Sequence, residues 1–248
     1  MKNGIDVSVY QGNIVWPKVK AAGIEFAIIR AGYGKLASQI DDKFITNYNG
    51  ATQAGVKVGA YWYSYATTPA EAKHEAEACI KVLNKRKFDY PIYFDVEEQR
   101  AFLTGRENVS AMIAAFCDTL ERAGYYAGVY TSASAASSYF NDNVRKKYDI
   151  WVAHWGVNKP SYDIYGMWQN SDRGSINGIN GAVDTDVAYK DYPKIMEGCG
   201  LNNYPKKEVK PVVTDNNKTD TKTETKKDKK TITITIDGKT YKGTVTEV

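Results

Sequence analysis

Two carboxylates stand at the end of one of the most apolar stretches of the sequence. Residues 90–97 read Tyr-Pro-Ile-Tyr-Phe-Asp-Val-Glu, a pattern that predicts a β-strand carrying Asp95 and Glu97 at its end. Because side chains alternate along a strand, the two acids share one face with Cα atoms about 7 Å apart, and Ile92, Phe94 and Val96 share the other, which should pack on a helix. A single acid at a strand end is usually a solvent-facing group. Two on one face can bracket one bond of a substrate, and each makes ionisation of the other harder.

The pair has the composition that hydrolysis of a glycosidic bond requires. That reaction needs one carboxylic acid kept protonated to release the leaving oxygen, and a second group that stabilises the developing positive charge. Glu97 is the candidate acid, because it has the longer side chain and because the carboxylates of Asp95, Asp6 and Asp184 would raise its pKa. Asp95 would stay ionised, either as nucleophile or as orienter of a substrate amide that attacks its own ring. Asp6 and Asp184 could instead cap loops. Asp186 lies two residues after Asp184, so the sequence does not decide which of the two faces the site.

The sequence contains few of the residues that a zinc-dependent hydrolase or an enzyme with a serine or cysteine nucleophile would need. The two histidines, His74 and His154, lie far apart in the sequence, whereas a hydrolytic zinc site normally draws on two or three. The sequence has no Gly-x-Ser-x-Gly elbow, and two histidines leave few partners for a serine or cysteine nucleophile. We therefore expect neither a metal nor another cofactor.

Tyrosine dominates the aromatic content. The chain has 19 Tyr against 7 Phe, and amphipathic aromatic side chains in that number are typical of a cleft for a polar, flat-faced ligand such as a sugar, although Tyr-rich cores also exist. The candidate substrate-binding residues, each of which could instead belong to the core, are Tyr33, Tyr63, Tyr65, His154, Trp155 and Trp168.

Eight predicted strands and the helices between them would position these residues. Strands are expected at residues 4–10, 25–33, 56–66, 90–97, 126–131, 149–155, 165–170 and 182–189. Helices are expected at residues 16–22 and 41–54, after a capping box at Thr68 and Glu71, and from Asn108 to Gly124. Any helix between residues 139 and 147 is short, and none is evident between residues 155 and 165.

This alternation predicts an α/β fold: an irregular TIM-like (β/α) barrel of parallel strands, with eight strands and fewer than eight helices. The C-terminal ends of barrel strands gather on one face, so Asp6, Asp95, Glu97 and Asp184 should converge there. The alternative is an open doubly wound sheet. Against it, no Gly-rich phosphate loop connects a strand to a helix, as dinucleotide binding would need.

Composition divides the chain into three parts. Residues 1–201 form the predicted catalytic barrel, and residues 202–230 are a polar linker rich in Lys and Thr. Residues 231–248 predict a β-hairpin that turns at Asp237 and Gly238. Its apolar face, formed by Ile232, Ile234, Tyr241 and Val245, should dock on another copy of the chain or on a cell-surface component, for oligomerisation or wall targeting.

The charge distribution, the cysteines and the lack of long apolar stretches limit the classes of protein to which the chain can belong. The net charge of +4 falls within residues 206–230, which hold nine Lys against five acids, so the barrel region is neutral and lacks the basic face of a nucleic-acid binder. Cys79 and Cys117 lie on apolar helical faces and are expected to be buried free thiols. No stretch approaches transmembrane length, and no signal-peptide core follows Met1. We therefore expect cytoplasmic synthesis, no membrane insertion, and another exit route for any work outside the cell.

Several motifs, in order along the chain, carry a family resemblance. Gly-Ile-Asp-Val-Ser-x-Tyr-Gln-Gly at residues 4–12, Asp-Val-Glu at 95–97, Trp-Val-Ala at 151–153 and Val-Asp at 183–184 together resemble the signatures of glycoside hydrolase family 25. These are the lysozymes (N-acetylmuramidases) of bacteria and phage endolysins, and the similarity covers about residues 3–195. The chain departs from the family at Asp186, where Asn is frequent.

The resemblance implies an irregular barrel that cleaves the β-1,4 bond between N-acetylmuramic acid and N-acetylglucosamine with retention of configuration. Glu97 resembles the family's proton donor, and Asp95 the residue proposed as nucleophile or as helper of the 2-acetamido group. Asp6 and Asp184 match the two further acids. The implied partner is bacterial peptidoglycan, reached after holin-type release or lysis. A catalytically silent wall-binding protein and a chitinase-like hydrolase are the alternatives.

Overall fold

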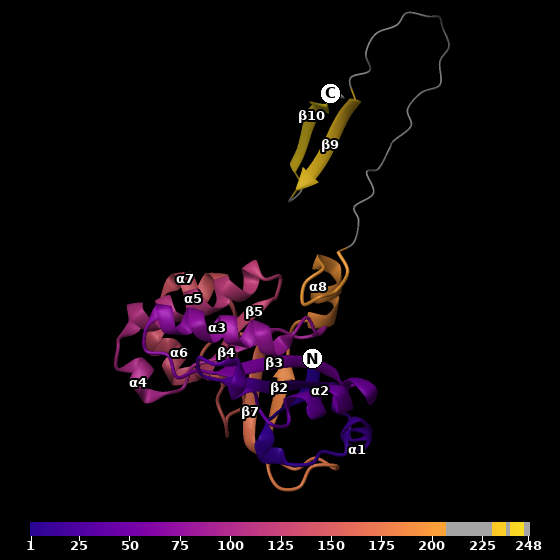
Figure 1. The fold of residues 1–248 in the computed structure, drawn as a ribbon, viewed down its shortest axis with the longest axis vertical. Coiled ribbons are helices and arrows are strands. Elements are labelled where there is room, and N and C mark those ends of the chain that lie inside the picture. Colours follow the sequence, from indigo (N-terminus) through magenta and orange to yellow (C-terminus); the bar gives the residue numbers. More distant parts are fainter. Residues whose placement is uncertain (207–229, 237–238, 246–248) are drawn as a thin grey trace, which may run out of the picture. The chain divides into compact units, whose positions relative to one another are not determined.

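A computed structural model describes residues 1–206, 230–236 and 239–245. The chain divides into two compact units, Met1–Glu208 and Val209–Val248, and each is described by itself. Figure 1 shows the elements of both units along the chain.

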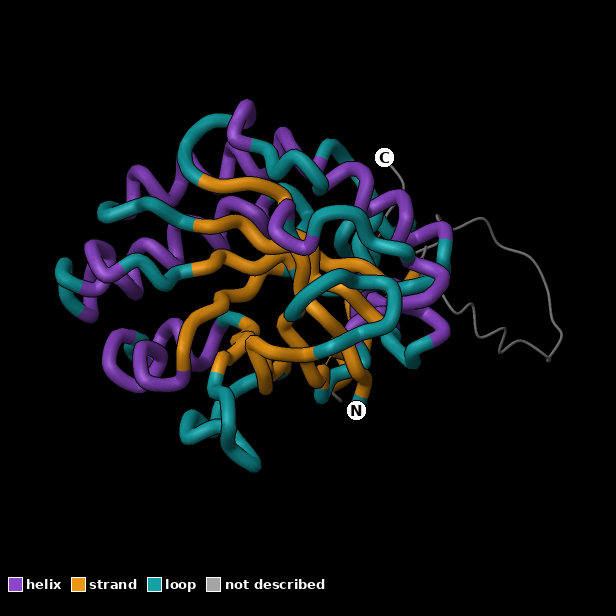
Figure 2. The backbone as a smooth tube through the Cα atoms, turned by 90° about the horizontal axis from the view of Figure 1, so that it is seen from below, coloured by secondary structure: helices purple, strands orange, loops and turns teal. Residues whose placement is uncertain are grey.

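The first unit is built on a closed barrel of eight strands in sequence order. The strands are β1 (Lys2–Val7), β2 (Phe26–Tyr33), β3 (Lys57–Tyr63), β4 (Ile92–Asp95), β5 (Ala127–Ser132), β6 (Asp149–Ala153), β7 (Met167–Gly174) and β8 (Val183–Ala188). Figure 2 shows these strands gathered in the middle of the unit with helices outside them. The predicted irregular eight-stranded barrel is thereby confirmed.

The expectation that every strand runs parallel is wrong for β8. Strands β1 to β7 pair in parallel, whereas β8 pairs antiparallel with both β7 and β1. The reason is the short connection at residues 175–182, because a parallel return needs a crossover of a dozen or more residues. The mixed barrel still brings Asp184 to the cavity end, since that residue lies opposite Asp6 in the β1–β8 register.

Eight α-helices occur in the described residues, rather than fewer than eight. They are α1 (Trp16–Ala21), α2 (Phe44–Gln53), α3 (Pro69–Leu83), α4 (Gln99–Phe102), α5 (Arg106–Arg122), α6 (Ala133–Tyr139), α7 (Asp142–Lys147) and α8 (Tyr192–Cys199). The irregularity of the barrel is instead one of placement, because no helix lies between β6 and β7 or between β7 and β8.

Three of these helices, α4, α6 and α8, were not predicted, and α5 begins at another residue than expected. Helix α6 was not predicted, because its sequence Ala-Ser-Ala-Ala-Ser-Ser-Tyr has no periodic pattern of large apolar residues. Helix α5 begins at Arg106 and not at Asn108, whose side-chain amide donates to the carbonyl oxygen of Thr67 instead of capping the helix.

Strand β4 alternates as its sequence predicts. Ile92 and Phe94 belong to the apolar layer between strands and helices, where the Phe94 ring stacks on Phe116 of α5 with centroids 4.2 Å apart. Tyr93 belongs to the aromatic cluster on the other side, inside the barrel. This alternation leaves Asp95 on the inner face, where it is buried.

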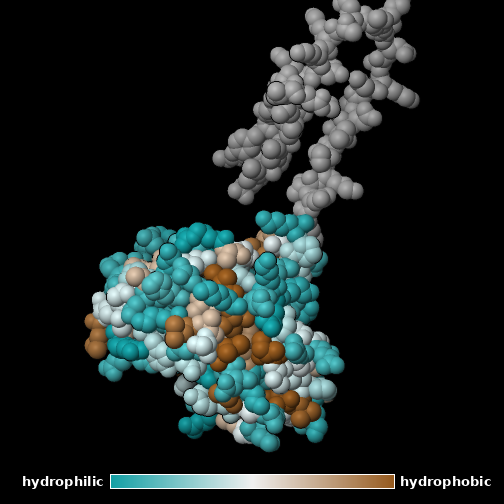
Figure 3. All heavy atoms as spheres, viewed as in Figure 1, coloured by the Kyte–Doolittle hydropathy of each residue, from teal (hydrophilic) through white to brown (hydrophobic). Residues whose placement is uncertain are grey.

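The cysteines and the surface agree with the compositional expectations. Cys79 and Cys117 are buried and free, as predicted, and Cys199 is exposed and free. Figure 3 shows a face of the first unit that is mostly hydrophilic around a central group of hydrophobic residues. None of the helices in the described ranges is both long enough and apolar enough to cross a membrane.

The folded body extends beyond the predicted boundary at residue 201. Asn202 is fully buried, and its side-chain oxygen accepts from the backbone N–H of Tyr126 at 2.7 Å while its amide donates to the carbonyl oxygen of Tyr90 at 2.8 Å. Tyr204 donates its hydroxyl to Asp89 at 2.6 Å. The predicted linker was therefore wrong at its start, because a pattern of apolar residues cannot detect a polar side chain that pairs with buried backbone groups.

Replacing Asn202 by Ala is expected to lower the free energy of unfolding by about 2–4 kcal/mol, because two buried backbone groups lose their partners. Denaturant unfolding followed by far-UV circular dichroism measures this. Asn203→Ala is the matched control, since Asn203 has a similar left-handed backbone (φ 64°) but bonds at an exposed site. Equal losses in both variants would show that backbone conformation, and not the buried amide, explains the effect.

The second unit contains an antiparallel hairpin of β9 (Lys230–Ile236) and β10 (Lys239–Val245). Tyr241 pairs with Ile234, and Lys239 pairs with Ile236, across the two strands. The expected turn residues Asp237 and Gly238, and residues 207–229 of the expected linker, lie outside the described residues. Docking of the hairpin on a partner stays a prediction.

Candidate active site

A cavity of about 760 Å³ opens at the end of the barrel where the parallel strands finish and the antiparallel β8 begins. Its wall includes all four predicted catalytic acids, Asp6 from β1, Asp95 and Glu97 from the end of β4, and Asp184 from β8. Residues from distant parts of the chain thus meet in one place, as the predicted barrel requires.

Strand register explains why these acids meet. Asp6 lies directly opposite Asp184 across the antiparallel β1–β8 pair. Asp95 lies between Tyr63 of β3 and Tyr130 of β5. The alternation of each strand turns these side chains toward the barrel interior, so the acids form one face of a continuous wall.

Asp6 lies at the buried end of a hydrogen-bond chain. The amide nitrogen of Gln169 donates to Asp6 Oδ2 at 2.7 Å, and the Gln169 oxygen accepts from the Tyr130 hydroxyl at 2.9 Å and from the Trp155 indole at 3.0 Å. Burial raises the pKa of Asp6 well above its usual range, with further increases from Asp186 and Asp184, while Gln169 lowers it. A buried acid of this kind favours its neutral form.

Asp186 lies beside Asp6 and is also fully buried. The Trp151 indole donates to Asp186 Oδ1 at 2.8 Å, whereas Oδ2 has no hydrogen-bond partner within the described residues. Burial raises the pKa of Asp186 well above its usual range, and the contact with Asp6 lowers it. Asp186, like Asp6, therefore favours its neutral form.

The predicted catalytic pair has two different environments. Asp95 is 4% exposed and its Oδ1 has no hydrogen-bond partner in the described structure, whereas Glu97 is solvent-exposed within the cavity. Burial, then Glu97, raises the pKa of Asp95 well above its usual range, and the Arg30 guanidinium lowers it. Loss of hydration against the cavity wall, then Glu98 and Asp184, raises the pKa of Glu97. Burial therefore works against the expectation that Asp95 simply stays ionised.

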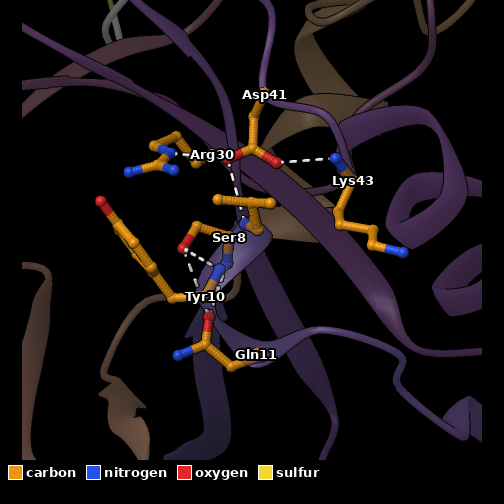
Figure 4. A network of polar contacts seen from close by, with 7 residues as sticks. Ser8, Tyr10, Gln11, Arg30, Asp41 and Lys43 are labelled. Carbon is orange, nitrogen blue, oxygen red and sulfur yellow. Dashed lines mark hydrogen bonds and ion pairs between the residues drawn. The ribbon is translucent and has the colours of Figure 1, made fainter.

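Arg30 is the one basic residue among the described residues that line the cavity, and an ion pair holds it in place. Its Nε donates to Asp41 Oδ2 at 2.7 Å, and the same oxygen accepts from the backbone N–H of Val9 at 3.1 Å. The ring of Tyr10 covers the guanidinium, 4.9 Å from its centroid. Figure 4 shows this network, in which Asp41 also accepts from the backbone N–H of Lys43.

The same network corrects the predicted first strand. Strand β1 ends at Val7 and not at residue 10, and a short 3-10 helix follows at Val9–Gln11. Ser8 caps that helix, since its hydroxyl accepts from the backbone N–H of Tyr10 at 3.3 Å. The alternation of apolar and polar residues continues past the end of the strand, and for that reason the prediction was too long. Val9 and Tyr10 contact Asp41 and Arg30 rather than pairing with a neighbouring strand.

Replacing Arg30 by Met is expected to move the acidic limb of the pH–activity profile to higher pH by about one unit, because Asp95 loses the cation that lowers its pKa. The rate of glycan hydrolysis, the activity expected from the sequence, measures this between pH 4 and pH 8. Arg30→Lys keeps the positive charge and should shift the limb less. An acidic limb that stays in place in Arg30→Met would contradict the role of Arg30.

The predicted substrate-binding aromatics fall into two groups. Tyr33, Tyr63, Tyr65 and Trp155 line the cavity as expected. Trp168 does not: it is 8% exposed and packs in the apolar layer outside the barrel, with its indole donating to the His154 carbonyl. Its assignment as a sugar platform was wrong, because Gln169 faces the barrel interior and its neighbour on the strand must face outward.

His154 is also absent from the wall of this cavity. It lines a smaller cavity with Trp155, and its Nδ1 accepts from the backbone N–H of Ser161 at 3.1 Å. The structure therefore places His154 in the smaller cavity and not beside the acids, and its role in substrate binding stays a prediction.

Several residues of the site were not predicted. They are Tyr61, Arg30, Asp41, Tyr130, Trp151, Gln169 and Asp186, of which all but Asp186 line the cavity. A charged or amide residue inside an otherwise apolar strand is the available signal, as for Arg30 in Phe-Ala-Ile-Ile-Arg-Ala and Gln169 after Met-Trp. In the described part of the chain, no group of three or more His, Cys, Asp or Glu residues is arranged to hold a metal ion.

Comparison with known proteins agrees with the geometry. Residues 5–179 match the family model "Glycosyl hydrolases family 25". The autolytic lysozyme of Clostridium acetobutylicum is 33% identical over 184 residues, which cover 74% of this chain and 54% of that protein. The chain thus spans about half the length of that relative.

Two solved structures have a similar fold. The CTP1L endolysin has a TM-score of 0.71 at 25% identity, covering 80% of this chain and 70% of that one. The modular autolysin LytC of Streptococcus pneumoniae, solved in complex with a synthetic peptidoglycan ligand, has a TM-score of 0.68 at 27% identity, covering 76% of this chain and 46% of that one. Barrel, acidic cavity and family match together show that this chain belongs to glycosyl hydrolases family 25.

Proposed function

We propose that this protein is a peptidoglycan hydrolase that cleaves the β-1,4 bond between N-acetylmuramic acid and N-acetylglucosamine, with retention of configuration. The observation that carries the proposal is the meeting of Asp6, Asp95, Glu97 and Asp184 in one cavity of a family 25 barrel. Its wall includes the aromatic side chains of Tyr33, Tyr63, Tyr65 and Trp155, on whose faces sugar rings can stack.

Glu97 is proposed as the general acid. Its side chain lies in the open cavity, where a leaving oxygen and a later water molecule can both reach it. Its pKa is raised, so a larger fraction of it is protonated near neutral pH than for an ordinary glutamate. After the leaving group departs, the ionised Glu97 can accept a proton from the attacking water.

Asp95 is proposed to stabilise the positive charge that develops on the sugar ring. The Glu97 carboxylate raises the pKa of Asp95, so after the first of the two acids ionises the second ionises less readily, and a state with one proton precedes full ionisation. Arg30 lowers the pKa of Asp95 and thereby favours placing the charge on Asp95 in that state. An ionised Asp95 then acts as nucleophile or orients the substrate's 2-acetamido group for attack on its own ring.

Asp6 and Asp184 are proposed to support this pair. Asp184 raises the pKa of Glu97, which maintains the acid in its protonated form. Asp6, held by Gln169, is suited to donate or accept a hydrogen bond deep in the cavity. The names of the relatives, an autolytic lysozyme and an autolysin with a peptidoglycan ligand, support bacterial cell wall as the substrate.

Release of new reducing ends from purified peptidoglycan tests the proposal. Borohydride reduction of the products followed by mass spectrometry should find reduced muramic acid at the new ends, as cleavage after N-acetylmuramic acid requires. Binding to the wall without new reducing ends would instead indicate a silent wall-binding protein. Reduced glucosamine at the new ends would contradict the proposed bond.

A further inference from the structure

A second cavity of about 340 Å³ lies beside the proposed active site. The last residues of β5 and β6 and the residues that follow these strands form it, and Trp155 lines both cavities. The polar residues of its wall are Ser132, Ser134, His154 and Ser161. None of the roles proposed for the four acids uses it.

The two cavities differ sharply in charge. The described residues that line the first include seven aspartates and glutamates and one arginine. Those that line the second include no aspartate, glutamate, lysine or arginine. An anionic part of a ligand is repelled by the first cavity and finds no such repulsion in the second.

Hydrogen-bond donors are available in the second cavity. Because His154 Nδ1 accepts from the Ser161 N–H, the neutral imidazole carries its proton on Nε2, which can donate to a ligand. The hydroxyls of Ser132 and Ser134 lie 3.1 Å apart, so when one donates to the other, the second can still donate outward. Amide carbonyls and carboxylates are the acceptors that such donors recognise.

Trp155 gives the second cavity a fixed position relative to the first. Its indole N–H donates to Gln169, which in turn donates to Asp6, so the ring is tied to the buried acids. The side chain is still 47% exposed. A ligand that follows the wall of acids therefore passes this ring before it reaches the second cavity.

We propose that the second cavity binds the peptide stem of the peptidoglycan strand whose sugars occupy the first. This inference rests on the proposed function. The stem is attached to the lactyl group of the muramic acid, and it is rich in amides and carries carboxylates. Those groups match the uncharged donors beside Trp155 and would be repelled by the acids of the active site.

The test compares soluble, uncrosslinked glycan strands that carry their stems with the same strands after an amidase has removed them. The variant is Ser134→Trp, which fills the second cavity from an exposed position of α6. Its matched control is Ser138→Trp, an exposed position of the same helix that does not line the cavity. Ser161→Trp fills the cavity from another residue of its wall and serves if Ser134→Trp does not fold.

For wild type, removing the stems should raise KM by about tenfold, which corresponds to about 1.4 kcal/mol of binding. Ser134→Trp should raise KM by a similar factor on stem-bearing strands alone, with kcat little changed, and Ser138→Trp should match wild type on both. Equal effects of Ser134→Trp on both substrates, or no effect on either, would overturn the stem site. A wild type that cleaves neither substrate would contradict the proposed function itself.

Discussion

Glu97→Gln is expected to lower the rate of wall hydrolysis by about 100- to 10,000-fold while the protein stays folded, because the amide cannot transfer a proton to the leaving oxygen. Glu97 follows β4 and is solvent-exposed in the cavity, so the substitution should not disturb the core. The measurement is the release of reducing ends from peptidoglycan, with the thermal unfolding midpoint as the check on folding.

The neighbouring substitution Glu98→Gln gives the comparison. The Glu98 carboxylate raises the pKa of Glu97, so its removal should lower that pKa. Because Glu97 must be protonated to act, the basic limb of the pH–activity profile should then move to lower pH, while the rate at the optimum falls far less than in Glu97→Gln. A Glu97→Gln variant that retains its rate would exclude Glu97 as the acid.

The barrel and the convergence of the acids could be predicted because both depend on local patterns. Alternation in residues 90–97 puts Asp95 on the inner face, and a closed barrel then brings it to the same end as Asp6. The antiparallel β8 could have been inferred from its short connection to β7, because eight residues between β7 and β8 are too few for a crossover.

The supporting residues could not be predicted in the same way. Gln169 reaches Asp6 across 163 residues of sequence, and Arg30 is positioned by Asp41, which itself depends on the turn at Val9. Such contacts are set by the closed barrel and by no local pattern. The sequence therefore reveals the acids, including Asp184, which raises the pKa of Glu97, but not the contacts through which Arg30 and Gln169 act on Asp95 and Asp6.

Asp95→Asn should lower the hydrolysis rate at least about 1000-fold, which corresponds to roughly 4 kcal/mol of transition-state stabilisation, because the neutral amide can neither attack the sugar ring nor balance its charge. The substitution keeps the shape of a side chain that is 4% exposed. The rate on peptidoglycan measures the loss, and azide distinguishes the two roles. Rescue of Asp95→Gly by azide, with a glycosyl azide as product, would indicate a nucleophile.

Asp95→Asn should also be more stable than the wild type at neutral pH. Burial raises the pKa of Asp95 in the folded state, so between its ordinary pKa of 3.8 and the folded value the native protein binds more protons than the unfolded chain. The Asp95 carboxyl thus contributes to the free energy of unfolding at low pH, and this contribution is lost as the pH rises. The amide of Asn does not ionise, so Asp95→Asn avoids the loss. Thermal unfolding at pH 4 and pH 7.5 tests the sign: the gain of Asp95→Asn over wild type should be larger at pH 7.5. A variant that is inactive and also less stable at pH 7.5 would mean that Asp95 supports the fold, and its loss of activity would then say nothing about catalysis.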